Sequence, residues 1–240
     1  MWRRLRFAAI AIGIVTLFLI VTFQFIEDDS WDSWNLPLSG RVIILDPGHG
    51  GPDGGAEADG VIEKDIALSV AKKLRDYLQQ QGAMIIMTRE SDTDLAGEGV
   101  NGFSNRKRVD LRKRVELINY SEADLFISIH LNSFPSSRWS GAQTFYTLRY
   151  EENERAAKFI QREIRDTLEN TSREARPISN VYLMRNAKKP GVLVEVGFLS
   201  NAEERQNLTS EAYQNKIAAS IYKGVMRYFT EKKYVVAEKK

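Results

Sequence analysis

The longest hydrophobic run of the chain lies at its N-terminus. Residues 7–26 carry no charge, three arginines precede them, and three acidic residues follow them. A helix over this run would be about 30 Å long, enough to cross the hydrocarbon core of a membrane, and the positive-inside rule would keep its N-terminus in the cytoplasm. We therefore expect residues 1–26 to form a transmembrane signal anchor, with a cleaved export signal as the alternative. Either would place the rest of the chain outside the cytoplasm.

Beyond residue 40, short apolar runs alternate with segments in which apolar residues recur every three or four positions. The short runs are typical of buried strands, and the longer period is typical of amphipathic helices. Strands are predicted at 42–45, 83–88, 124–129, 142–148, 181–184 and 191–196, and helices at 64–81, 107–119, 151–170 and 210–229. The alternation predicts an α/β domain whose first strand–helix–strand unit is parallel, with a right-handed crossover.

These patterns divide the chain into four parts, and no internal repeat is visible among them. We predict the anchor at 1–26, a polar linker at 27–40, one globular domain at 41–230 and a charged tail at 231–240. A domain of this length is large enough to bury a substantial core.

Composition limits the chemistry that this domain can perform. There is no cysteine, so disulfides and thiolate metal sites are excluded, and any metal ion must be bound by histidine and carboxylate side chains. The chain contains only two histidines, His49 and His130. Without the three N-terminal arginines, 31 basic residues face 32 acidic ones, and this balance argues against nucleic acid as a partner.

One segment departs from this balance. Residues 105–114 contain six basic side chains, five of them within the helix predicted at 107–119. Such a cluster indicates either a solvated helix face or a surface that contacts an anionic polymer or lipid. The sequence leaves both open.

A glycine-rich loop follows the first predicted strand. Asp46, Pro47 and Gly48 end the strand, because proline lacks a backbone donor and glycine permits turn conformations, and His49 lies just beyond it. The loop does not match the dinucleotide-binding motif G-x-G-x-x-G, since Asp53 stands where the third glycine belongs, and it lacks the Gly-Lys-Ser/Thr of a P-loop. It therefore indicates either a metal site or a structural loop with an incidental histidine.

Three side chains are candidate metal ligands. His49 and His130 each follow a predicted core strand, and Glu63 opens the helix after the glycine-rich loop. The carboxyl ends of parallel strands form the ligand-binding edge of α/β sheets. Two imidazoles and one carboxylate suit a catalytic zinc ion, which keeps a fourth position for water. A lone histidine at a strand end is more often a hydrogen-bonded core residue, but both histidines fall at this edge, which favours the metal.

Glu195 is a further candidate, because it lies inside the apolar run G-V-L-V-E-V. An unpartnered carboxylate costs several kcal/mol in an apolar environment. It could be neutralised by a buried ion pair, for instance with Arg89 or Arg185. Alternatively it is a general base beside the metal, and the residues alone do not exclude exchanged roles for Glu63 and Glu195.

Several motifs closely resemble those of the zinc-dependent N-acetylmuramoyl-L-alanine amidases, and the resemblance extends from about residue 41 to 229. The motifs are D-P-G-H-G-G-x-D-x-G-A at 46–56, E-K-D at 63–65, T-R at 88–89, A-D-L-F-I-S-I-H-x-N at 123–132 and V-E-V-G-F-L-S-N at 194–201.

The resemblance implies a single three-layer domain of the phosphorylase/hydrolase-like type, with a mostly parallel six-stranded sheet between helices. It implies one zinc ion bound by His49, Glu63 and His130, and a catalytic role for Glu195. The chain departs from the family pattern at Leu131, where alanine is usual.

The resemblance also implies a reaction, the hydrolysis of the amide between muramic acid and L-alanine in peptidoglycan. A single domain behind an N-terminal hydrophobic segment, with no wall-binding repeats, looks most like the germination-specific members that modify spore cortex on the way to muramic lactam. Two alternatives stay open, a zinc peptidase that cuts wall peptides and an inactive peptidoglycan-binding module. The preferred stem peptide, the need for an activator protein and the oligomeric state are not predicted.

Overall fold

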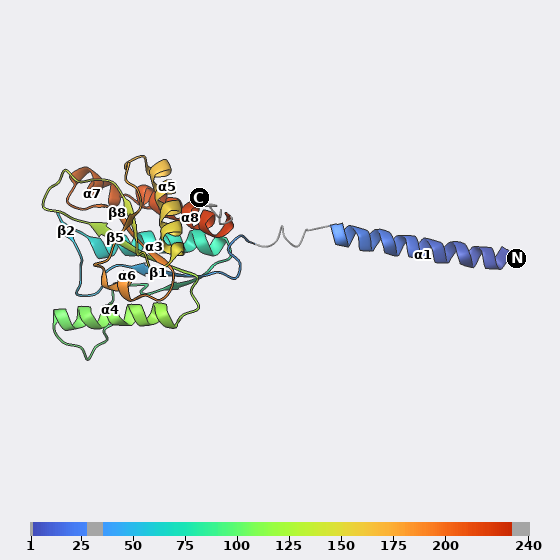
Figure 1. The fold of residues 1–240 in the computed structure, drawn as a ribbon, viewed down its shortest axis with the longest axis horizontal. Coiled ribbons are helices and arrows are strands. Elements are labelled where there is room, and N and C mark those ends of the chain that lie inside the picture. Colours follow the sequence, from blue (N-terminus) through green and yellow to red (C-terminus); the bar gives the residue numbers. More distant parts are fainter. Residues whose placement is uncertain (1, 28–35, 232–240) are drawn as a thin grey trace, which may run out of the picture. The chain divides into compact units, whose positions relative to one another are not determined.

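The computed structural model of the chain describes residues 2–27 and 36–231. The chain forms two compact units, Met1–Leu36 and Pro37–Lys240. Figure 1 shows the elements of both units. Most of the predicted linker and almost all of the charged tail lie outside the described residues.

The first unit contains helix α1, Trp2–Glu27. The hydrophobic run is therefore helical, as predicted, and the helix also includes the three arginines that precede the run. No helix within the described ranges is both long enough and apolar enough to cross a membrane. The transmembrane signal anchor predicted for residues 1–26 is therefore not supported.

The second unit is built on a mixed sheet of six strands. Their order across the sheet is β4 (Met84–Met87), β1 (Val42–Pro47), β5 (Leu125–Asn132), β8 (Gly191–Phe198), β6 (Gln143–Tyr146) and β7 (Arg176–Pro177). The first four are parallel, β6 is antiparallel to β8, and β7 is parallel to β6. The four parallel strands therefore present their carboxyl ends at one edge.

Helices cover both faces of this sheet, which makes three layers (Figure 1). On one face, α3 (Glu63–Gln80), α5 (Glu151–Leu168) and α8 (Glu211–Thr230) pack on the larger core. On the other face, α4 (Phe103–Tyr120) and α6 (Tyr182–Asn186) pack on a smaller core around Ile44 and Phe126. Alternate residues of β5 and β8 point into the two cores, as the twofold period of a strand requires.

The elements differ from the prediction in three places. Residues 181–184 were predicted as a strand, but they lie at the start of α6, where Leu183 and Met184 pack onto the sheet instead of joining it. The sixth strand is β7, in a segment predicted as a loop. The short hairpin β2–β3 (Glu57–Ala58, Val61–Ile62) and helix α7 (Ala202–Leu208) were not predicted.

A buried ion pair joins β1 to α4. Asp46 and Arg114 each have 2% of the side chain exposed, and Arg114 Nη1 lies 2.7 Å from Asp46 Oδ1. Thr88 and Ser128 donate to the same carboxylate at 2.7 and 2.6 Å. Burial alone would raise the pKa of Asp46, but the charge of Arg114 and these hydrogen bonds outweigh burial and hold it below its ordinary value. The carboxylate is therefore charged and fully bonded inside the fold.

We expect Asp46→Asn to destabilise the protein by about 3–5 kcal/mol at pH 7, because Arg114 would then be buried without this carboxylate. The folded pKa of Asp46 is lowered, so its contribution is complete above the unfolded value of about 4 and is lost as the pH falls through the folded value. The difference from wild type should therefore shrink below about pH 4. Urea unfolding of the full-length chain at several pH values measures it.

Asp76→Asn is the matched control, since Asp76 is exposed and pairs with Arg75 at the surface. Its effect should be at most about 1 kcal/mol at any pH. Equal losses for the two variants would mean that the buried pair does not stabilise the fold.

Candidate metal centre

The candidate residues meet at the carboxyl edge of the parallel strands. His49 follows β1, His130 lies near the end of β5, and Glu63 is the first residue of α3. Glu195 in β8 is the direct neighbour of His130 in the parallel pairing of the two strands. All four sequence candidates therefore lie in one region of the fold.

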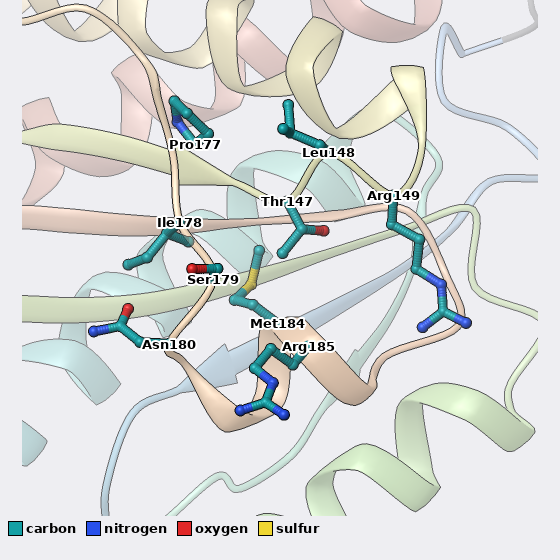
Figure 2. Close-up of a pocket in the computed structure, with 9 residues that line it drawn as sticks. All are labelled: Thr147, Leu148, Arg149, Pro177, Ile178, Ser179, Asn180, Met184 and Arg185. Atoms are coloured by element: carbon teal, nitrogen blue, oxygen red, sulfur yellow. The ribbon is translucent and has the colours of Figure 1, made fainter.

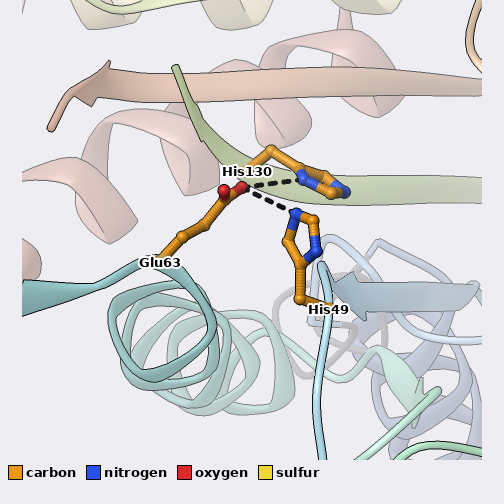
Figure 3. Close-up of side chains that lie close together, drawn as sticks. All are labelled: His49, Glu63 and His130. Carbon is orange, nitrogen blue, oxygen red and sulfur yellow. Dashed lines mark hydrogen bonds and ion pairs between the residues drawn. The ribbon is translucent and has the colours of Figure 1, made fainter. Parts of the chain in front are cut away.

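Three of these side chains converge on one point (Figure 3). Glu63 Oε1 lies 3.2 Å from His49 Nε2 and 2.9 Å from His130 Nδ1. One ligand atom from each residue lies within 4.8 Å of the other two. Two imidazole nitrogens and one carboxylate oxygen at this spacing can bind a single metal ion, and this set of donors fits zinc.

The loop after β1 requires close backbone approach. A Cβ atom on Gly48 would lie 2.3 Å from the ring of His130, and one on Gly55 would lie 2.5 Å from Glu63 Oε2. His49 itself has a φ of 61°, in the left-handed region that is costly for a side chain larger than glycine. Arg114 stabilises this conformation by donating to the carbonyl of His49 at 2.6 Å.

Asp53 lies behind His49 and was not among the predicted site residues. Its Oδ2 is 2.9 Å from His49 Nδ1, outside the angles of a good hydrogen bond, and Lys107 Nζ is 3.1 Å from the same oxygen. Burial opposes the charge of His49, but Asp53 and Glu63 outweigh burial and raise the pKa of His49 to about 9. The sequence carried two signals for Asp53, its position four residues after His49 and its place in the motif at 46–56. Carboxylates in this position orient a histidine toward a metal.

Glu63 is held on both oxygens. Its Oε2 accepts from the backbone of Ala56 at 2.8 Å, and its Oε1 accepts from the backbone of Leu131 at 2.9 Å. Burial would raise the pKa of Glu63, but the two histidines, His130 first, outweigh burial and lower it. Leu131, the departure from the family pattern, turns its side chain into the larger core and leaves its backbone to fix the carboxylate.

Glu195 is the least satisfied carboxylate of the site. Its Oε2 is buried and has no hydrogen-bond partner. Burial raises the pKa of Glu195 to about 7, and of its charged neighbours His130 opposes the rise and Glu63 adds to it. A carboxyl group with a pKa near neutrality can both accept and release a proton at physiological pH.

The proposed ion-pair partners of Glu195 are engaged elsewhere or exposed. Arg89 donates to the carbonyls of Pro47, Gly48, Lys64 and Ser91, so it braces the glycine-rich loop. Arg185 is exposed and lines a separate cavity of about 610 Å³ (Figure 2). That cavity follows the end of β6, which is antiparallel to β8, so it lies toward the opposite edge of the sheet. The ion-pair alternative for Glu195 is not found among the described residues.

A smaller cavity opens onto the metal centre. It has a volume of about 150 Å³, and His49, Asp53 and His130 line it together with residues of α4 and α6. Tyr182 and Lys107 belong to this lining, although neither was predicted as a site residue. The cavity therefore adjoins two of the three candidate ligands, His49 and His130.

Comparison with known proteins assigns the chain to a class. Residues 43–227 match the family described as N-acetylmuramoyl-L-alanine amidase, and the chain belongs to this family. Within it, the chain is 58% identical over 232 residues to the germination-specific N-acetylmuramoyl-L-alanine amidase of Bacillus subtilis (strain 168). That alignment covers 97% of this chain and 98% of the relative. The resemblance inferred from the motifs is therefore confirmed.

Solved structures of amidases have the same fold as this chain. The CwlD amidase of Clostridioides difficile, solved in complex with the GerS lipoprotein, is 41% identical with a TM-score of 0.76 and covers 78% of this chain and 98% of its own. The catalytic domain of CwlV from Bacillus (Paenibacillus) polymyxa var. colistinus is 31% identical with a TM-score of 0.69. It covers 80% of this chain and 99% of that domain.

We expect the full-length protein to bind about one zinc ion and His130→Ala to lose most of it, because only two protein ligands would remain. Elemental analysis after dialysis against trace zinc measures the occupancy. Ser104→Ala is a suitable control, since Ser104 is an exposed residue of α4 outside the ligand set. A His130→Ala protein that is folded and still fully loaded would remove His130 from the ligands.

Proposed function

We propose that this protein is a zinc-dependent amidase that hydrolyses the bond between N-acetylmuramic acid and L-alanine in peptidoglycan. His49, Glu63 and His130 hold the metal ion, and Glu195 is the general base. The observation that carries the proposal is the convergence of three ligand atoms beside a buried carboxylate that lacks a hydrogen-bond partner. Membership of the amidase family supports the same reaction.

Zinc in such a site acts as a Lewis acid that acidifies water and polarises a carbonyl group. The side chains of the site would fix the position of the metal ion. Glu63 is fixed by two backbone donors, and Arg114 holds the backbone of His49 by donating to its carbonyl. The ligands are therefore held before substrate arrives, which lowers the cost of reaching the reactive geometry.

Glu195 moves the proton. Its unpartnered Oε2 accepts a proton from the attacking water as the oxygen adds to the amide carbon, and the carboxyl group then donates that proton to the amide nitrogen as the carbon–nitrogen bond breaks. The products are a free carboxyl group on the lactyl side chain of muramic acid and a peptide with a free amino terminus. The pKa of about 7 suits both halves of this transfer.

The biological setting is proposed from the similarity to a relative that is 58% identical. The similarity to the germination-specific amidase of Bacillus subtilis extends over almost the whole of both chains. We infer that this protein acts outside the cytoplasm on spore-cortex peptidoglycan, where removal of the peptide is a step toward muramic lactam.

We expect Glu195→Gln to lower turnover by about 10²- to 10⁴-fold and to keep zinc, because glutamine preserves the shape but cannot accept the proton. Glu63→Gln should instead weaken zinc binding, and added zinc should restore part of its activity. Zinc content and cleavage of defined muropeptides are measured for both variants. Glu203→Gln, at an exposed position, is the control.

The opposite outcome, with zinc lost from Glu195→Gln and retained in Glu63→Gln, would mean that Glu195 is the ligand and Glu63 the base. The products separate the remaining alternatives. New carboxyl groups on amino acids instead of muramic acid would indicate a peptidase, and binding of muropeptides without cleavage by the zinc-loaded wild type would indicate a binding module.

A further inference from the structure

A groove leads away from the metal centre between α4 and α6, which lie on the same face of the sheet (Figure 1). The cavity at the metal centre and an outer cavity of about 290 Å³ share Lys107, Leu111 and Tyr182 in their linings. Because three residues line both cavities, the two cavities adjoin each other. We call them together the α4–α6 groove.

The outer cavity has apolar and aromatic side chains in its lining. Leu111 lines both cavities, and Phe103 and Tyr182 line the outer one. The two aromatic residues are 54% and 45% exposed, although a ring of either kind would gain from burial. An apolar surface next to a catalytic cavity is suited to small hydrophobic groups of a substrate.

The carboxylates that line this groove are already paired. Asp53 is 3.1 Å from Lys107, and Asp110 is 2.8 Å from the buried Arg114. Asp46 pairs with Arg114 as well. The negative charges at the inner end of the groove are therefore neutralised within the fold.

Arg108 is different. It lines the outer cavity and is exposed, and its guanidinium donates to the side chain of Asn105 at 3.0 Å. Across the described ranges, no carboxylate lies within ion-pair distance of it. The outer end of the groove therefore presents a positive charge that an anionic ligand can neutralise.

We propose that the α4–α6 groove binds the stem peptide of the substrate, and that Arg108 recognises the carboxylate of the glutamate that follows L-alanine. This inference rests on the proposed function. The alanine methyl group lies over Leu111 and Tyr182. Arg108 and Leu111 are three positions apart on α4 and share a face about one turn, or ~5 Å, apart. One peptide residue spans about 3.5 Å. With the alanine at Leu111, the side chain of Arg108 therefore reaches the carboxylate of the glutamate that follows.

The charge complementarity favours the peptide over the glycan strand, whose sugar rings carry no charge once the lactyl groups are joined to peptides. Arg108 therefore determines specificity, and it does not take part in the chemical step. Its removal should change substrate binding without changing the proton transfer at Glu195.

The experiment compares two muropeptides that differ only at the glutamate α-carboxyl group, which is free in one and amidated in the other. Arg108→Gln in the full-length, zinc-loaded protein should raise KM for the free carboxylate about three- to fivefold and leave kcat unchanged. With the amidated substrate, the variant and the wild type should have the same KM, because this substrate has no carboxylate for Arg108 to bind in either protein.

Arg112→Gln is the matched control, since Arg112 is exposed on the same helix and lies outside both cavity linings. Tyr182→Ala tests the apolar contact with the alanine methyl group. Its control is Tyr120→Ala, which changes an exposed tyrosine at the end of α4. Only Tyr182→Ala should raise KM, and it should do so for both substrates.

Two results would overturn the inference. One is equal KM values for Arg108→Gln and Arg112→Gln with the free carboxylate. The other is a loss for Arg108→Gln that is the same for both peptides and grows with the number of sugar residues, which would place the glycan in the groove. Failure of the proposed function itself is distinguishable, because the zinc-loaded wild type would then cleave neither muropeptide.

Discussion

The buried pair of Asp46 and Arg114 is the interaction on which the site depends. It joins the carboxyl end of β1 to α4, and Arg114 also donates to the carbonyls of Pro47 and His49. The same guanidinium therefore fixes the strand end, the strained backbone of His49 and the position of α4. Because α4 forms one wall of the groove, the ion pair sets the distance between the metal centre and the surface that surrounds it. The pair therefore ties the loop that bears His49 to α4.

Electrostatic balance explains how so many titratable groups share one sheet edge. Each imidazole faces at least one carboxylate, and Glu63 is shared between the two. Asp53 is shared in turn between His49 and Lys107. Glu195 stands outside this pairing, and burial raises its pKa while the other carboxylates stay charged. Glu63 and Glu195 therefore reach opposite protonation behaviour through their surroundings alone, as the roles proposed for them, ligand and base, require.

Much of this arrangement could be predicted from the sequence, because strand-end histidines and apolar runs report on local structure. The strands β1, β4, β5, β6 and β8, the four long helices and the meeting of His49, Glu63, His130 and Glu195 were predicted. Residues 181–184 were predicted wrongly, since four apolar residues fit a strand or a short buried helix equally well. Lys107 could not be assigned, because its contact with Asp53 joins segments that only the tertiary fold brings together. Arg114 was read as part of a basic surface cluster, and only the structure reveals that it is buried.

The separation of the ligands along the chain has a thermodynamic consequence. His49, Glu63 and His130 come from a loop, a helix start and a strand, so the three donors meet only after the sheet has formed. A metal ion that binds this set binds the folded chain and not the unfolded one, and its binding energy adds to the stability of the whole domain. At a free concentration 100 times the dissociation constant, the gain is about 2.7 kcal/mol. The supply of metal ion would then control how long the folded domain persists as well as how fast it works.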